Sequence, residues 1–275
     1  MKKGDTGADI SILQRQLINA GFKITVDGWF GDATEAALIA FQRRAGLVVD
    51  GVASHRTQAT LLTRNANCKH LSERALDTAA QRLGVELAAI KAVSEVESGS
   101  AGFLDDGRPV ILYERHVAYR QLGESGVDID KADRLAERYP NVVGKKRGGY
   151  AGGAAEWARL NHARQVLPAG IPEAACSWGR YQIMGYHWQV LGYPSLAEFV
   201  AEMSENEGLQ LAAFVRFIEA DPALHKALKA KKWADFAKAY NGPAYRDNAY
   251  DAKLASAYAR HARLLEGART DQEAA

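Results

Sequence analysis

The chain has 275 residues, of which 25% are charged, and its formal net charge is +2. This length accommodates two domains with buried cores. So small a net charge gives no bulk electrostatic signal for nucleic-acid binding, and no apolar run approaches the length of a transmembrane helix.

The segment 1–65 contains a short internal repeat. An Asp-Gly pair at Asp27-Gly28 is followed by Thr34, and the pair at Asp50-Gly51 is followed by Thr57 at the same spacing. Asp-Gly forms a tight turn, and the Thr lies close to the start of the next helix. Helical periodicity between the turns predicts two helices, over 9–20 and 33–45.

These positions resemble the three-helix peptidoglycan-binding domain found in many cell-wall hydrolases. The match covers about residues 1–63 and rests on Gly4-Asp-Thr-Gly7, Leu13-Gln14, Leu17, Gly21-Phe22, Asp27-Gly28, Phe30-Gly31, Thr34, Phe41-Gln42, Gly46-Leu47, Asp50-Gly51 and Thr57. It departs at Ser54, where the second repeat usually has Gly, so an altered second turn is expected. Family members bind peptide stems of peptidoglycan, which implies a wall anchor; the alternative is a helical domain without wall affinity.

A short polar connector, 66–71, leads into a second domain. Ser72 is expected to cap a helix that runs to about Arg82. A further helix is predicted over 86–97, with a stop signal at Ser98-Gly99.

Glu97 is the most informative residue of that helix. Ile90, Val93 and Glu97 are spaced i, i+3, i+7, so Glu97 shares an apolar face and is predicted to have a raised pKa. A carboxyl group that is protonated near neutral pH is what a general acid needs. Glu95 falls on another side, where it can pair with Lys91 in solvent. The alternative is that Glu97 merely reaches solvent past its apolar neighbours.

The remaining chain is predicted to be mostly helical. A turn is expected at 102–107, and the run 109–113 predicts a short strand at the edge of a small hairpin. From about residue 155 onward helical patterning dominates, and the segment 267–275 is expected to be a frayed tail.

Three separated segments of this region resemble the active-site motifs of goose-type lysozymes and soluble lytic transglycosylases. They are Glu97-Ser98-Gly99, Ser177-Trp178-Gly179-Arg180-Tyr181-Gln182-Ile183-Met184-Gly185 and Ala239-Tyr240-Asn241-Gly242-Pro243. A longer set, covering most of 72–265, resembles modular phage endolysins with an N-acetylmuramidase domain, and the domain order is the same. That set is Val96-Glu-Ser-Gly, Gly102-Phe-Leu, Asp106-Gly-Arg-Pro109, Ile111-Leu-Tyr-Glu-Arg-His116, Ser177-Trp-Gly179, Gln182-Ile-Met-Gly185 and Tyr240-Asn-Gly-Pro243.

The resemblance implies a mainly α fold: a small three-helix bundle, then an α-rich lysozyme-like (α+β) domain over 72–266 with a minor β-hairpin. It implies cleavage of the β-1,4 bond between N-acetylmuramic acid and N-acetylglucosamine, with Glu97 protonating the glycosidic oxygen. No cofactor or metal is expected.

A second group is needed to direct water or to stabilise charge on the far side of the sugar. The candidates are Glu114 on the predicted strand and Asp105 or Asp106 in the turn, with Glu114 favoured. An ion pair of Glu114 with Arg115 or Arg147 is the alternative reading.

The resemblance also implies residues that contact sugar N-acetyl groups or position Glu97. The predicted substrate-binding residues are Ser98, Tyr113, Ser177, Trp178, Tyr181, Gln182, Tyr240 and Asn241. Tyr113, Trp178 and Tyr181 offer flat faces for sugar stacking, and core packing is the alternative for each of them.

Three other functions remain open. A lytic transglycosylase would use the same Glu and form a 1,6-anhydro product. A peptidase or amidase would need a metal site or a nucleophile such as Cys176 with His187, but the His spacing matches no zinc motif, and a buried structural thiol is commoner. A non-catalytic wall-binding protein is disfavoured because Glu97 and Gln182 are retained.

The expected partner is bacterial peptidoglycan, with no nucleic acid and no stable membrane association, and a monomer is expected. Cys68 and Cys176 match no disulfide framework, and the N-terminus has no secretion-type apolar segment. The expectation is therefore a phage lysin that accumulates in the host cytoplasm. It would reach the wall, in the periplasm, after a holin-like protein permeabilises the membrane, and would cause host lysis.

Overall fold

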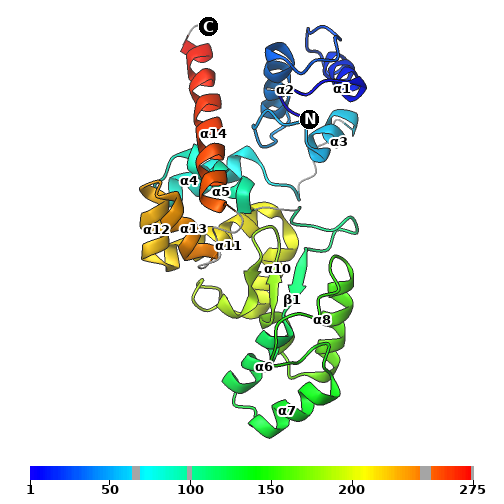
Figure 1. Ribbon diagram of the computed structural model, residues 1–275, viewed down its shortest axis with the longest axis vertical. Helices are drawn as coiled ribbons and strands as arrows, with labels where there is room; N and C mark the ends of the chain where they lie inside the picture. The colour runs from blue at the N-terminus through cyan, green and yellow to red at the C-terminus, as the bar shows by residue number, and fades with distance from the viewer. Residues whose placement is uncertain (64–68, 98–100, 242–248, 274–275) are drawn as a thin grey trace.

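The computed structural model describes residues 1–63, 69–97, 101–241 and 249–273. Its buried apolar residues form two separate clusters, one within residues 10–61 and a larger one within 71–254. Each cluster is the core of one domain. Figure 1 shows the N-terminal domain at one end of the long axis, beside the C-terminal helix.

Three helices make up the N-terminal domain: α1 (Ala8–Asn19), α2 (Asp32–Arg44) and α3 (His55–Thr63). The predicted helices 9–20 and 33–45 are confirmed to within one residue at each end. Their apolar faces enclose a core formed by Ile10, Leu13, Leu17, Phe30, Ala37, Leu38, Phe41, Leu47, Ala53 and Leu61.

The internal repeat is built from two matching glutamine networks. Gln14 Nε2 donates to the carboxylate of the Asp27-Gly28 turn at 2.7 Å, and Gln14 Oε1 accepts from both backbone N–H groups of that turn. Gln42 makes the same contacts with the Asp50-Gly51 turn, again with a 2.7 Å bond to the carboxylate. Both glutamines are buried, so each one fixes an Asp-Gly turn against a helix.

Ser54 stands in place of the usual glycine without disrupting the second turn. Its Oγ accepts from the backbone N–H of Thr57 at 3.2 Å, which is an N-cap contact. At the matching position in the first repeat, Gly31, an added Cβ would lie 3.1 Å from the Trp29 ring. The second repeat has the smaller Val52 in place of that ring, which explains why a side chain fits at position 54.

The second domain consists of helices around one small sheet. Its elements are α4 (Glu73–Leu83), α5 (Leu87–Glu97), β1 (Ile111–Tyr113), α6 (Arg115–Glu124), α7 (Ile129–Arg138), α8 (Ala155–Val166), α9 (Ile171–Ala174), β2 (Cys176–Trp178), β3 (Ile183–Met184), η1 (Gly185–His187), α10 (Leu196–Glu205), α11 (Glu207–Ala220), α12 (Pro222–Lys229), α13 (Trp233–Asn241) and α14 (Tyr250–Glu273). The predicted mainly α fold with minor β structure is confirmed. Among the described residues, no helix combines the length and the apolar character needed to cross a membrane.

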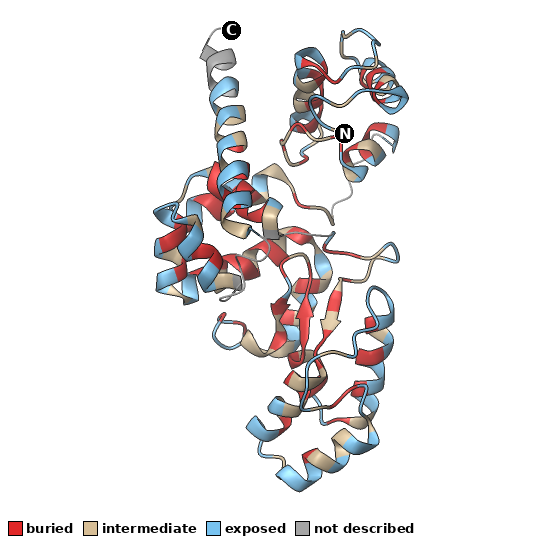
Figure 2. Cartoon of the chain, viewed as in Figure 1, coloured by how far each residue is buried: buried red, intermediate tan, exposed pale blue. Residues whose placement is uncertain are grey.

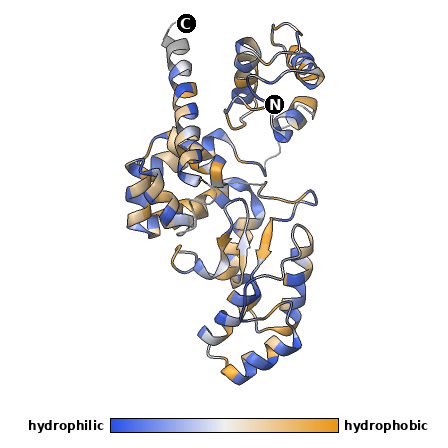
Figure 3. Cartoon of the chain, in the orientation of Figure 1, coloured by the Kyte–Doolittle hydropathy of each residue, from blue (hydrophilic) through white to orange (hydrophobic). Residues whose placement is uncertain are grey.

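The sheet is antiparallel with the order β1-β2-β3. β1 is confirmed as an edge strand, and it is coloured as hydrophobic in Figure 3. The hairpin, however, is formed by β2 and β3, and β1 pairs with β2 from far along the chain, with Ile111 opposite Trp178. The turn of this hairpin, residues 179–182, lies in the second motif of the sequence.

Helix α5 packs between α4 and α14. The predicted cap of α4 is confirmed, since Ser72 Oγ accepts from the backbone N–H of Ala75 at 3.2 Å. α14 continues to Glu273, so it includes most of the segment 267–275 that was predicted to be frayed. Figure 2 shows that α14 is largely exposed where it extends past α5.

Candidate active site

Glu97 is the last residue of α5, so the helix ends where the sequence predicts. Ile90 and Val93 are buried on the predicted apolar face. For Glu97 and Asn241 the structure describes the helical backbone alone, and Ser98 lies outside the described residues. The raised pKa of Glu97 therefore stays a prediction.

The predicted pairing of Glu95 with Lys91 in solvent is wrong, because Lys91 is buried. The ammonium of Lys91 pairs with Glu73 of α4. Glu95 instead pairs with Arg260 of α14 and lies 2.9 Å from His261 Nε2. Burial opposes ionisation of Glu95, but the bonds from His261 and Arg260 outweigh it and lower the pKa of this carboxyl group.

Tyr181 joins the three segments that the sequence singles out. Its hydroxyl lies 2.9 Å from Ser94 Oγ, one turn before Glu97 on α5. Its backbone carbonyl accepts from the Tyr240 hydroxyl at 3.1 Å, and its ring stacks on Phe214 of α11 with 4.7 Å between centroids. The end of α5, the hairpin turn and the end of α13 therefore meet at this residue.

Gln182 has a backbone conformation that is uncommon for a residue other than glycine, with φ of 49°. Its Oε1 accepts from Ser177 Oγ at 2.6 Å, and its Nε2 donates to the carbonyl of Gly179 at 2.8 Å. Such left-handed residues cost about 1–3 kcal/mol and are found where the surrounding structure holds a side chain in place. Ser177 is buried, so its hydroxyl orients the Gln182 side chain and does not reach the solvent.

The predicted sugar-stacking role of Tyr113, Trp178 and Tyr181 is corrected by their burial. Tyr113 and Trp178 are fully buried, and Tyr181 is 2% exposed. The Tyr113 hydroxyl donates to the carbonyl of Val142 at 2.8 Å, and Trp178 Nε1 donates to the carbonyl of Glu173 at 3.1 Å. Their rings therefore pack in the core of the second domain.

Glu114 follows β1 and is 6% exposed. Its carboxylate accepts from the Tyr150 hydroxyl at 2.8 Å and lies 3.1 Å from His116 Nδ1 and 3.7 Å from Arg147 Nη2. Arg115 instead donates to backbone carbonyl groups. The ion pair that was predicted as the alternative role of Glu114 is therefore formed with Arg147 and not with Arg115.

Asp105 and Asp106 lie in an exposed turn. The turn is closed by a bond from the Gly107 N–H to the carbonyl of Leu104 at 2.9 Å. Asp106 accepts from the backbone and guanidinium groups of Arg108, and the guanidinium bond lowers the pKa of this carboxyl group. Of the three candidate carboxylates, Glu114 alone is buried.

Two further polar residues near this junction were missed in the sequence, Glu207 and Gln210 of α11. Both are buried, and both contact the segments that follow Glu97 and precede Gln182. A signal was present, since Glu207 is in phase with Leu211 and Phe214 just as Glu97 is with Ile90 and Val93.

The described part of the chain offers no site for the peptidase alternative. Cys176 is fully buried, and burial raises the pKa of its thiol well above the usual value. A thiolate nucleophile is disfavoured in such surroundings. Among the residues that the structure describes, no group of three or more His, Cys, Asp or Glu could hold a metal ion.

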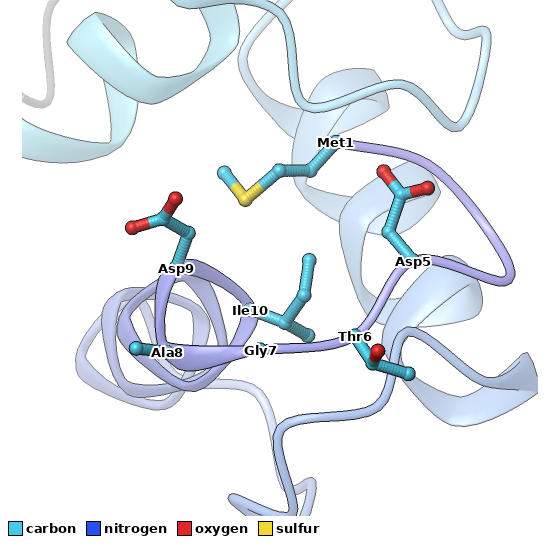
Figure 4. A pocket seen from close by; sticks show the side chains of 7 residues that line it. All are labelled: Met1, Asp5, Thr6, Gly7, Ala8, Asp9 and Ile10. Carbon is cyan, nitrogen blue, oxygen red and sulfur yellow. The ribbon is translucent and has the colours of Figure 1, made fainter.

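The described residues line a larger and a smaller pocket. The larger, of about 1380 Å³, lies between the domains and is bordered by Ser94 of α5 and by Phe103 in the loop beyond its end. The smaller, of about 350 Å³, belongs to the N-terminal domain, where Met1 and Asp9 line the start of α1 (Figure 4). Apart from Asp105, none of the predicted site residues that the structure describes lines either of these two pockets.

Comparison with known proteins identifies both domains. Residues 86–262 match the family model of N-acetylmuramidase, and residues 6–61 match that of a putative peptidoglycan binding domain. The crystal structure of the Burkholderia AP3 phage endolysin is similar over almost the whole chain, with a TM-score of 0.90. Its sequence is 52% identical, and the match covers 96% of this chain and 99% of that one.

Shorter similarities link the chain to two proteins of Bacillus licheniformis. A probable N-acetylmuramoyl-L-alanine amidase is 36% identical over 70 residues, and the N-acetylmuramoyl-L-alanine amidase CwlL is 38% identical over 72 residues. These matches cover 24% and 25% of this chain and 20% of each relative, so the chain spans a fifth of their length.

Proposed function

Because the chain belongs to the N-acetylmuramidase family, whose members are glycoside hydrolases of the lysozyme type, we propose that it cleaves the glycan strands of peptidoglycan. The bond cleaved is the β-1,4 linkage between N-acetylmuramic acid and N-acetylglucosamine. The N-terminal domain, a match to peptidoglycan-binding domains, holds the enzyme on the wall. The observation that carries the proposal is the meeting of the end of α5 with the hairpin turn and α13 at Tyr181.

Glu97 acts as the general acid. It protonates the glycosidic oxygen as the bond to the muramyl carbon breaks and positive charge develops on the ring. Its place at the C-terminal end of α5 supports this role, because that end of a helix carries partial negative charge and disfavours a second negative charge. The apolar neighbours Ile90 and Val93 act in the same direction.

Glu114 acts on the other side of the sugar, where it directs water or stabilises the developing charge. The hydrogen bond from the Tyr150 hydroxyl, together with the nearby His116 ring, holds the carboxylate in one orientation, as this task requires. The residues that contact N-acetyl groups or position the acid are Ser98, Gln182, Tyr240 and Asn241, with Ser177 acting through Gln182.

A lytic transglycosylase is the second candidate, because its acid would occupy the same helix end. In that reaction the carboxylate of Glu97 would deprotonate the muramyl C6 hydroxyl, which closes a 1,6-anhydro ring in place of attack by water. The two reactions differ in their products and are separated by analysing them.

Mass spectrometry of fragments released from purified peptidoglycan tests the proposal. We expect reducible muramic acid ends from the parent and from Glu95→Gln, and none from Glu97→Gln. Glu95 is a matched control, since it lies on the same helix and its ion pair is with α14. Fragments lighter by one water would indicate a transglycosylase. Unbroken glycan with cut stems, or full activity of Glu97→Gln, would contradict the proposal.

The similarity to a phage endolysin supports a role in host lysis. The protein would accumulate in the host cytoplasm as a monomer and depend on a holin-like membrane protein for access to the wall in the periplasm. Expression with and without a holin tests this dependence, with lysis expected only in its presence.

A further inference from the structure

Helix α11 begins with a buried carboxylate at the junction of the two domains. Glu207 is fully buried, and Gln210, one turn later on the same face, is 1% exposed. Burying a carboxylate is costly unless cations and hydrogen bonds compensate it. The partners of these two side chains therefore show which segments the helix holds together.

Glu207 contacts four segments of the chain at once. Its carboxylate accepts from the backbone N–H of Gly102, just beyond the end of α5, and from that of Leu71 in the connector, both at 2.8 Å. It also accepts from Arg56 Nη2 of α3 at 2.8 Å and lies 3.6 Å from Arg180 Nη1 in the hairpin turn. The segment after Glu97, the connector, the N-terminal domain and the hairpin turn thus share one carboxylate.

Gln210 completes the contact with the hairpin turn. Its Oε1 accepts from the backbone N–H of Arg180 at 2.7 Å, and its Nε2 donates to the carbonyls of Met203 at 2.8 Å and Gly102 at 3.3 Å. A Cβ added at Gly102 would lie 2.2 Å from Gln210 Oε1, and one added at Gly179 would lie 2.4 Å from Gln210 Cδ. Both motif glycines are needed for this close approach.

Arg56 is the one cation of the N-terminal domain on this carboxylate among the described residues, and its side chain is 19% exposed. Burial opposes ionisation of Glu207, but Arg180, Arg56 and the Gly102 N–H outweigh it and lower the pKa of this carboxyl group. Without Arg56, part of that compensation is lost inside the protein. The contacts to Gly102 and Arg180 would then have to change.

Other basic side chains in the pocket between the domains are likewise engaged with protein groups. Lys91 pairs with Glu73, and Arg260 pairs with Glu95. Both ion pairs lie within the second domain and compensate these two charges, so neither cation forms an anion site. The contact of Lys91 with the N-terminal domain is a bond from its Nζ to the carbonyl of Val49 at 2.9 Å.

We propose that Arg56 is a positioning residue for catalysis: through Glu207, the N-terminal domain sets the geometry of the segments that flank Glu97 and Gln182. The domain then contributes to turnover as well as to wall attachment. This inference rests on the proposed glycosidase function, since turnover is its readout.

The test compares full-length variants on a short, peptide-free glycan oligosaccharide of alternating N-acetylglucosamine and N-acetylmuramic acid. Anchoring through peptide stems cannot contribute with this substrate. The variants are Arg56→Gln, Arg56→Lys and, as a control of equal charge change, Arg43→Gln on the exposed side of α2. Binding to insoluble peptidoglycan and thermal unfolding are measured alongside kcat and KM.

We expect Arg56→Gln to lower kcat by on the order of 10-fold, because small misplacements of catalytic groups have effects of this size or larger. KM and wall binding should change little, Arg56→Lys should recover part of the loss, and Arg43→Gln should match the parent. If Arg56→Gln keeps the parent kcat, or loses wall binding alone, the proposal is wrong.

A double variant distinguishes the proposed coupling from a loss of kcat that is caused by misfolding. If Arg56 acts through Glu207, the double variant Arg56→Gln/Glu207→Gln should have the kcat of Glu207→Gln alone. Independent, multiplying losses would contradict the proposal. Failure of the parent itself to cleave the oligosaccharide would instead count against the glycosidase function, so the two failures are distinguishable.

Discussion

At the scale of single residues, a carboxyl group that shares a helix face with apolar neighbours does not always have a raised pKa in this chain. Glu156 and Glu207 both lie on apolar helix faces and are fully buried. Yet the pKa of each is lowered, because hydrogen-bond donors outweigh the effect of burial. Spacing in phase with apolar residues therefore identifies a carboxyl group in an unusual environment, and no more than that. The donors that surround it decide the direction of the pKa shift.

Glu156 provides a test of that argument through the pH dependence of stability. It accepts from the backbone N–H groups of Ala151, Gly152 and Tyr113 and pairs with Arg159 at 2.7 Å. Burial raises its pKa, but these bonds outweigh burial, so the folded pKa lies below the ordinary value of 4.5. The stabilisation is therefore fully present above pH 4.5 and is lost as the pH falls through the folded pKa.

We expect Glu156→Gln to lower the free energy of unfolding at pH 7 by about 3 kcal/mol, because Arg159 is left buried without its partner. The variant should also lose less stability than the parent between pH 5 and pH 3. Urea unfolding at several pH values measures both effects, with Glu137→Gln on the exposed side of α7 as the control. Parallel pH profiles for parent and Glu156→Gln would show that the carboxylate is not held ionised by these bonds.

At the scale of elements, the helices were predictable and the sheet was only partly so. Local signals marked α1, α2 and α4, because periodicity and capping act within a few residues. The pairing of β1 with β2 joins Ile111 to Trp178, and nothing near either residue specifies a partner so far along the chain. Tyr113 and Trp178 are buried on these paired strands, so the structure supports core packing, the alternative reading, for both rings.

The burial of Lys91 has a similar origin. Its own helix places Glu95 one turn away, which predicts a solvent pair. The residues that bury it, Glu73 and Val49, come from another helix and another domain. Local spacing predicts partners only when no tertiary contact competes.

The glycine that ends the second motif has a packing role. Gly185 starts η1, and a Cβ added there would lie 2.1 Å from the backbone carbonyl oxygen of Glu173. Backbone atoms cannot move aside as a flexible side chain can. We expect Gly185→Ala to destabilise the protein by about 3 kcal/mol through overpacking.

Gly123 is the matched control for that substitution. It lies within α6, and an added Cβ meets nothing within 4 Å. Gly123→Ala should stabilise the helix by up to about 1 kcal/mol. Denaturant unfolding measures the change in the free energy of unfolding for both variants. Equal changes at the two positions would refute the packing role of Gly185.

At the scale of the whole molecule, the two domains are joined by buried polar contacts as well as by the connector. Lys91 Nζ donates to the carbonyl of Val49 at 2.9 Å, and Glu73 accepts from the Val49 N–H at 3.0 Å. An isolated bridge pairs Leu47 with Ser72 beside them. Short polar connectors usually permit relative motion. Here the contacts on both sides of the connector predict that the domains unfold together.

Lys91→Met tests this coupling. The substitution keeps the length and apolar stem of the side chain but leaves the Val49 carbonyl without its donor and Glu73 without its cation. Removing one partner of a buried pair costs about 3 kcal/mol, which is large compared with the stability of a contact between domains. We therefore expect one calorimetric transition for the parent and for Lys226→Met, an exposed control on α12, and two separate transitions for Lys91→Met. A single transition at the parent midpoint in Lys91→Met would mean that the domains are held together by other contacts, and two transitions in the parent would mean that they are not coupled at all.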